Sequence, residues 1–177
     1  MNLSKNYFEL FSLEIDFVLD RAALDSAFRD LQKEYHPDRF AHKSDAEQRH
    51  AVQNSAYLNT AYEALKSPLL RAQYLLSLRG VLTGEETRKQ LPMAFLVQQM
   101  ELRETLAEAP DASDPFAALE ALESQTRELE KCCFDDFQEA YSEGNLDKAE
   151  ESVRKLQFLK KLLSEIEAME DRLDEEC

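Results

Sequence analysis

The stretch that decides the fold covers residues 20–67 and reads DRAALDSAFRDLQKEYHPDRFAHKSDAEQRHAVQNSAYLNTAYEALKS. Apolar residues recur in it every three or four positions, the spacing of one buried stripe on an amphipathic helix. In the first half the stripe consists of Leu24, Ala27, Phe28, Leu31 and Tyr35. Pro37 disfavours helical backbone at the residue before it, so the first helix must end near Tyr35. The stretch therefore predicts two antiparallel helices joined by a corner.

Local signals around this hairpin predict further helices. Ser44 and Glu47 form a capping box that starts the second helix of the hairpin. Ser67–Pro68 can provide the N-cap and first position of a shorter helix, which Gly80 ends. Residues 6–11 read as a short helical turn that precedes the hairpin. We expect residues 1–80 to form one helical domain.

The second half of the chain predicts a separate bundle. Residues 81–91 (VLTGEETRKQL) are polar, and we expect them to form a linker. Helices are then expected over 92–109, from Asp114 toward Gly144, and from Asn145 onward, which makes a three-helix bundle over 92–177. The whole chain has only 3 Gly and 5 Pro in 177 residues, too few for a β-sandwich or barrel. The predicted fold class is all-α.

Charge is unevenly distributed along the chain, whose formal net charge is −15. Residues 1–80 contain 10 Lys and Arg against 11 Asp and Glu, whereas residues 81–177 contain 11 against 25. An acidic chain repels phosphate backbones, so we expect no nucleic-acid partner. No apolar run approaches the roughly 18 residues that span a bilayer, so we also expect no membrane insertion.

The cysteines and histidines predict no metal, cofactor or disulfide framework. The three cysteines are Cys132, Cys133 and Cys177, and the three histidines are His36, His42 and His50. No CxxC occurs, and the spacing fits neither zinc ligands nor paired disulfides. This usage is typical of a reducing cytosol, and the acidic residues near the N-terminus argue against a signal peptide.

The corner of the hairpin holds His36-Pro37-Asp38, the sharpest candidate for chemistry. Proline makes a stiff turn that would hold an imidazole and a carboxylate at the tip. The tripeptide alone is also compatible with a simple turn in which Asp38 bonds to local backbone, or with His36 as a general base oriented by Asp38. The enzyme interpretation is weak, because no nucleophile, metal set or Gly-rich loop accompanies the pair.

Two surfaces are candidates for protein docking. Arg29 and Lys33 share a face of the first hairpin helix, and Arg39 continues it past the turn, although such charge is commonly just solvated. On the expected helix 92–109, a core stripe of Phe95, Leu102 and Leu106 leaves a second apolar side unexplained. That side comprises Leu96, Val97 and Met100, flanked by Glu101, Glu104 and Glu108. Phe158 likewise lies off the predicted core stripe of the last helix, which consists of Val153, Leu156 and Leu163. A neighbouring helix or the first domain could cover it; otherwise it suits a protein partner.

Residues 6–80 resemble a J domain, the module that activates DnaK-class chaperone ATPases. The resemblance rests on Asn6–Phe11 (NYFELF), Tyr35–Asp38 (YHPD), Asn59–Leu65 (NTAYEAL) and Arg71–Tyr74 (RAQY). It implies that His36, Pro37, Asp38, Arg29, Lys33 and Arg39 bind the ATPase. Most J domains continue with Asp after that last Tyr, whereas here the apolar run 75–80 (LLSLRG) follows, which could dock on a second domain.

Nearly the whole chain resembles HscB-type co-chaperones of iron–sulfur cluster assembly, through 95–104 and 153–159 as well. This implies a non-enzymatic, monomeric protein of the bacterial cytoplasm that delivers an IscU-type scaffold to an HscA-type ATPase and stimulates its ATP hydrolysis. The implied scaffold-binding residues are Leu96, Val97, Met100, Glu101, Glu104, Glu108 and Phe158, with Val97 where a larger apolar residue is expected. A general J-protein that recruits unfolded clients stays the main alternative, and a cluster carrier using the cysteines is disfavoured by their spacing.

Overall fold

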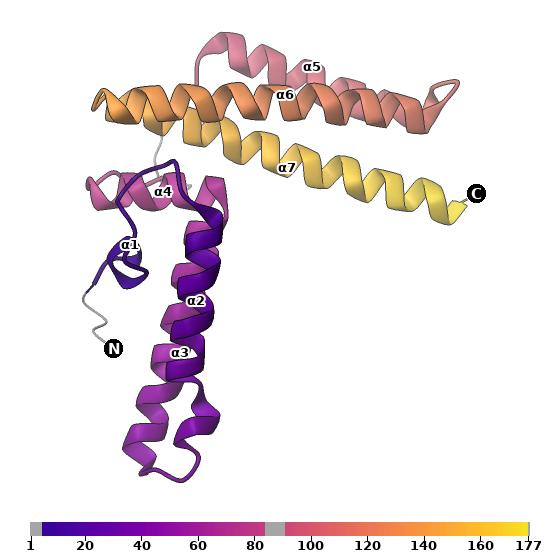
Figure 1. The fold of residues 1–177 in the computed structure, drawn as a ribbon. Helices are drawn as coiled ribbons and strands as arrows, with labels where there is room; N and C mark the ends of the chain where they lie inside the picture. The colour runs from indigo at the N-terminus through magenta and orange to yellow at the C-terminus, as the bar shows by residue number, and fades with distance from the viewer. Residues whose placement is uncertain (1–4, 84–90, 177) are drawn as a thin grey trace. The chain divides into compact units, whose positions relative to one another are not determined.

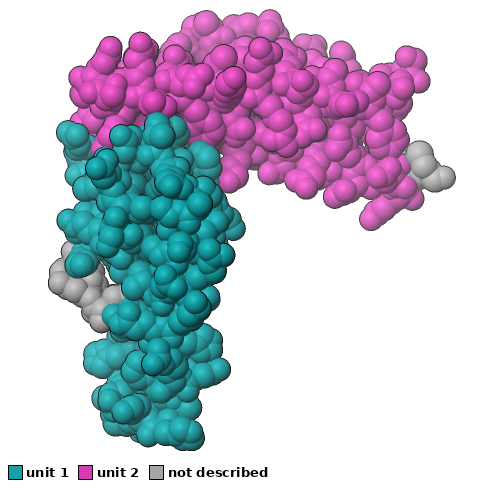
Figure 2. Space-filling model, in the orientation of Figure 1, with its two compact units in different colours: residues 1–79 teal, residues 80–177 magenta. Residues whose placement is uncertain are grey.

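The computed structural model describes residues 5–83 and 91–176, and all the regular elements in these segments are helices. The predicted all-α class is confirmed. The chain divides into two compact units, residues 1–79 and 80–177 (Figure 2). The expected linker over 81–91 lies mostly outside the described residues, as does Cys177. No helix in the described segments has both the length and the apolar character needed to cross a bilayer.

Unit 1 contains the predicted hairpin. Its elements are α1 (Tyr7–Leu10), α2 (Arg21–Tyr35), the 3-10 turn η1 (Pro37–Phe40), α3 (Asp45–Lys66) and α4 (Pro68–Leu78). Helices α2 and α3 lie side by side and antiparallel (Figure 1). The capping box at Ser44 and Glu47 is formed in both directions, and Ser67 caps α4. Helix α2 ends at Tyr35 as predicted, since His36 has extended backbone before the proline.

Burial in unit 1 is uneven along the hairpin. Leu24 of α2 and Leu58 and Leu65 of α3 are fully buried, and each such side chain contributes roughly 1.5–3 kcal/mol. No residue from 25 to 50 is buried, so the tip of the hairpin, residues 36–50, adds only exposed and partly covered side chains. The core of this unit therefore lies toward the end of the hairpin that is distant from residues 36–44.

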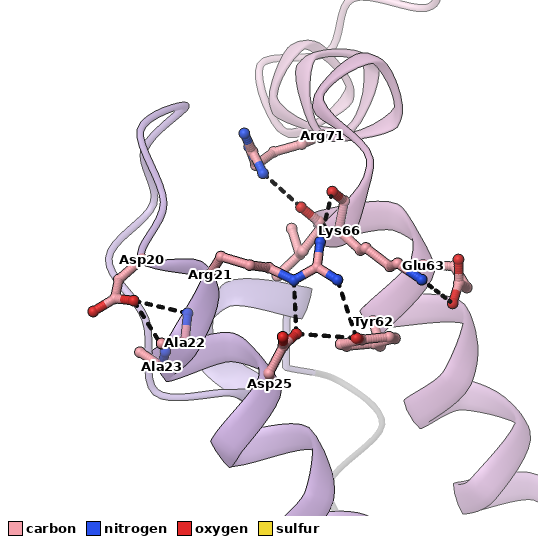
Figure 3. A network of polar contacts seen from close by, with 10 residues as sticks. Asp20, Arg21, Ala22, Ala23, Asp25, Tyr62, Glu63, Lys66 and Arg71 are labelled. Atoms are coloured by element: carbon pink, nitrogen blue, oxygen red, sulfur yellow. Dashed lines mark hydrogen bonds and ion pairs between the residues drawn. The ribbon is translucent and has the colours of Figure 1, made fainter.

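Polar contacts close the hairpin at that end (Figure 3). The Arg21 side chain donates to the Asp25 carboxylate at 2.7 Å and to the Lys66 carbonyl at 3.3 Å, and Tyr62 donates to the same carboxylate at 3.0 Å. Arg71 donates to the Leu65 carbonyl at 2.7 Å. The two arginines thus satisfy carbonyls of the last turn of α3, which have no partner within the helix. The hydrogen bond from Arg21 lowers the pKa of the Asp25 carboxyl.

Unit 2 is a bundle of three helices. Its elements are α5 (Met93–Glu108), the 3-10 turn η2 (Ala109–Asp111), α6 (Pro115–Ser142) and α7 (Leu146–Glu176). Helices α6 and α7 run antiparallel along each other, and α5 packs against both (Figure 1). Asp114 and Asn145 provide the predicted N-caps of α6 and α7. Gly144 makes the tight turn between them with a φ of +74°, which glycine adopts without steric cost.

The core of unit 2 confirms one predicted stripe and corrects another. Phe95, Leu102 and Leu106 of α5 are all buried, as predicted. In α7 the predicted Leu163 is only half-buried, and Leu159 and Leu162 are fully buried instead. Because α7 contacts both α5 and α6, its buried sector is wider than a single stripe.

Candidate functional site

The turn at the tip of the hairpin is held by its own hydrogen bonds. The backbone N–H of Asp38 donates to Nδ1 of His36 at 3.3 Å, and Pro37 occupies the first position of η1. The Arg39 side chain donates to the Lys33 carbonyl at 3.1 Å and so ties the turn to the last turn of α2. The Asp38 side chain is 91% exposed, and its carboxylate lies 3.5 Å from Nδ1 of His36. The turn therefore presents a carboxylate to solvent from a braced backbone.

This geometry does not favour either simpler interpretation of the tripeptide. In the described part of the chain, no hydrogen bond joins the Asp38 carboxylate to backbone, which a purely local Asx turn would have. Nδ1 of His36 already accepts the backbone N–H of Asp38 within the turn, whereas an oriented general base would use this nitrogen to bond to the carboxylate. The carboxylate is thus exposed to solvent on a turn that other groups hold in place.

The three expected cations differ in their surroundings. Arg29 and Lys33 are exposed one turn apart on α2, and Lys33 forms only a long ion pair of 3.5 Å with Asp30. Ion pairs this exposed contribute little, so both cations stay available to a partner. Arg39 is exposed too, but its guanidinium is turned back onto α2, so it also holds the turn in place.

The outer face of α5 carries the second candidate surface. Met100 is 72% exposed, Val97 is exposed and Leu96 is half-buried. The three carboxylates expected beside them, Glu101, Glu104 and Glu108, are all exposed. The sequence reasoning missed Met93, which is 74% exposed and precedes Val97 by four residues and Met100 by seven. That spacing puts it on the same helical face and could have been recognised.

Phe158 of α7 lies where α7 meets α5. Its ring packs edge-on against the ring of Phe95, with centroids 5.9 Å apart, and is half-buried. The guanidinium of Arg103 stands 5.4 Å from the Phe158 centroid, and Nη2 of Arg103 is 3.6 Å from Oε1 of Glu165. The sequence reasoning also missed this arginine, whose contacts depend on helix packing. That Leu96, Met100 and Phe158 act as one patch stays a prediction.

The two adjacent cysteines of α6 have opposite environments. Cys132 is exposed, whereas Cys133 is buried, and burial raises the pKa of the Cys133 thiol to about 11. A thiol with so high a pKa is a poor thiolate ligand, which argues against these two residues holding a cluster together.

Thiol reactivity checks this assignment. In a Cys177→Ser variant at pH 8, we expect one thiol, that of Cys132, to react quickly with a disulfide reagent. The second should react only after unfolding in denaturant, because Cys133 is buried and protonated in the folded chain. Equal rates for both thiols in the folded protein would contradict the burial of Cys133.

The chain is similar to a set of named co-chaperones over nearly its full length. A family described as the HSCB C-terminal oligomerisation domain matches residues 91–167. The co-chaperone protein HscB homolog of Vibrio atlanticus is 46% identical over 169 residues, covering 95% of this chain and 98% of that relative. The solved structure of chaperone HscB from Vibrio cholerae is 42% identical with a TM-score of 0.86, covering 96% and 99% of the two chains. Human co-chaperone protein HscB is 29% identical with a TM-score of 0.89, covering 96% and 84%. The chain belongs to the HscB family of co-chaperones.

Proposed function

We propose that this protein carries an IscU-type iron–sulfur scaffold to an HscA-type, DnaK-class ATPase and stimulates ATP hydrolysis by that partner. The observation that carries the proposal is the exposed Asp38 carboxylate on a braced turn. Family membership supports the co-chaperone role, and the exposed apolar face of α5 supports a second protein partner.

In this proposal residues 1–80 act as the J domain. His36 and Pro37 fix the turn, and Asp38 acts on the ATPase, so that no bond is made or broken in this chain. Because the turn is ordered before binding, little conformational freedom remains to be lost on association. Arg29, Lys33 and Arg39 would provide positive charge beside the carboxylate and orient an acidic partner.

Residues 92–177 act as the scaffold-binding domain in the same proposal. Leu96, Val97, Met100 and Phe158 would form the apolar centre of the interface. Glu101, Glu104 and Glu108 would form a polar rim, which suits an apolar patch bordered by basic groups on the scaffold. Val97 offers less area than a larger side chain, and Met93 adds exposed apolar surface next to it.

A reconstituted ATPase assay tests the proposal. The purified HscA-type ATPase is combined with this chain, with the scaffold, and with both, and ATP hydrolysis is measured in single turnovers. We expect the pair to stimulate hydrolysis more than the product of the separate effects. The same assay is repeated with a permanently unfolded model protein in place of the scaffold. Equal stimulation of ATP hydrolysis would show that the chain is a general J-protein instead.

Reversing the charges of Arg29 and Lys33 tests the proposed steering. In the Arg29→Glu/Lys33→Glu variant we expect association with the ATPase to slow about tenfold at low salt and to lose most of its salt dependence. Stopped-flow measurements at several salt concentrations would show both effects. The matched control is Arg127→Glu/Lys131→Glu, an exposed pair with the same spacing on α6, which should leave association unchanged. Equally slow association of the control variant would show that overall net charge, and not the position of Arg29 and Lys33, causes the effect.

The proposal includes one copy of the chain per complex, in the bacterial cytoplasm where these partners work. Sedimentation equilibrium of the isolated chain should give a mass of 20.4 kDa at micromolar concentration. A dimer that dissociates on dilution would contradict this part of the proposal and would agree with the description of the matched family as an oligomerisation domain.

A further inference from the structure

We infer that Arg103 is a positioning residue for scaffold binding, which acts by holding the ring of Phe158 in its binding orientation. The inference rests on the proposed function, since it assumes that Phe158 contacts the scaffold. Arg103 belongs to neither group of docking residues expected from the sequence.

Two contacts of Arg103 and one of Phe158 join these residues to each other and to the bundle. The Arg103 guanidinium lies 5.4 Å from the ring centroid of Phe158. The ring is also in edge contact with Phe95 of the core, at 5.9 Å between centroids. The guanidinium is in turn 3.6 Å from the Glu165 carboxylate, one helix away. Phe158 therefore lies against a buried ring and a guanidinium that is anchored on α7.

The half-exposed position of Phe158 explains why such a brace matters. A half-buried aromatic side chain can choose between staggered rotamers, and a partner that needs one of them must order the ring on binding. A planar guanidinium that contacts the ring favours one orientation before the partner arrives. Losing the guanidinium should therefore weaken binding without removing any contact to the scaffold.

The charge of Arg103 argues against direct contact with the scaffold. The rim of the proposed surface is formed by Glu101, Glu104 and Glu108, so the matching partner surface carries basic groups. A positive side chain that met such a surface would repel it. Within the described residues, Arg103 contacts Phe158 and Glu165, which both belong to the bundle.

A double-mutant cycle tests whether Arg103 acts through Phe158. The scaffold Kd is measured for the full-length chain and for the variants Arg103→Gln, Phe158→Ala and both together. We expect Arg103→Gln to raise Kd about three- to fivefold and Phe158→Ala at least fivefold. If the two effects were independent, the double variant would have a Kd about fifteenfold or more above that of the unmodified chain. If the arginine acts through the ring, Arg103→Gln raises Kd less than 1.5-fold in the Phe158→Ala background.

The matched control is Arg127→Gln on α6. Arg127 is 60% exposed and pairs with Glu123 at 2.6 Å, whereas Arg103 is 48% exposed and pairs with Glu165, so the two variants change charge alike. We expect Arg127→Gln to leave Kd within 1.5-fold. Aromatic NMR signals of Phe158 in the free chain should shift in Arg103→Gln and not in Arg127→Gln, which a general change of stability would not produce.

Each outcome of the cycle has a definite meaning. A full effect of Arg103→Gln in the Phe158→Ala background would show direct contact with the scaffold and overturn the inference alone. An effect no larger than that of Arg127→Gln would also overturn it. If Phe158→Ala left Kd unchanged, both the inference and the proposed docking face of α5 and α7 would be wrong.

Discussion

The Asp38→Asn variant should lose stimulation of the partner ATPase, by more than tenfold, and keep its helical fold. The side chain is 91% exposed and makes no core contact, and the turn is held by the backbone N–H of Asp38, which asparagine retains. Asparagine has the same shape but no charge, and it can still occupy a turn. The loss would therefore report the carboxylate itself.

Single-turnover ATP hydrolysis and circular dichroism together measure this result. The control is Asp30→Asn, which removes another exposed carboxylate, from α2, eight residues before Asp38, and should keep stimulation. Near-normal stimulation by a folded Asp38→Asn chain would reject the proposed role of the carboxylate. Reduced helicity would instead show that Asp38 is needed for the fold.

Replacing Leu96, Met100 and Phe158 together with Ala should weaken scaffold binding at least tenfold, about 1.4 kcal/mol or more. Apolar anchors at the centre of an interface can each cost around 2 kcal/mol when truncated, whereas rim carboxylates mainly change association rates. Stimulation of the ATPase in the absence of scaffold should survive, because Asp38 and its turn are unchanged.

Isothermal titration with purified scaffold gives the affinity, and thermal unfolding shows whether the bundle is intact. The matched control is Phe116→Ala on α6, an aromatic side chain that is 39% exposed and lies outside the proposed face. It should leave the affinity within twofold. Unchanged binding by the triple variant would mean that the scaffold docks elsewhere.

Local signals account for the elements that were predicted correctly. The helix ends follow from short-range chemistry: a capping box at Ser44 and Glu47, a proline after His36, and the caps Asp114 and Asn145. The stripe of Phe95, Leu102 and Leu106 follows in the same way from the helical period.

Contacts between distant residues could not be predicted from spacing. Arg21 and Arg71 reach carbonyls at the end of α3, and Leu162 is buried rather than Leu163, because of how neighbouring helices pack. At the tip, the sequence placed Arg39 among the exposed cations, but only the structure shows its bond to the Lys33 carbonyl. The helical period predicts that Phe158 lies off the core stripe, but it does not predict the contacts of its ring with Phe95 and Arg103 of α5.

The uneven burial of the α2–α3 hairpin sets the order in which it can open. The end where Arg21 contacts Tyr62 is also packed by buried leucines, so we expect it to open together with the core of unit 1. The tip, residues 36–50, contains only exposed and partly covered side chains, and we expect it to fray while the rest stays folded. A partner that binds the tip therefore contacts the segment of unit 1 with the least protection from amide hydrogen exchange. We expect its binding to slow exchange at the tip before it does so elsewhere in the unit.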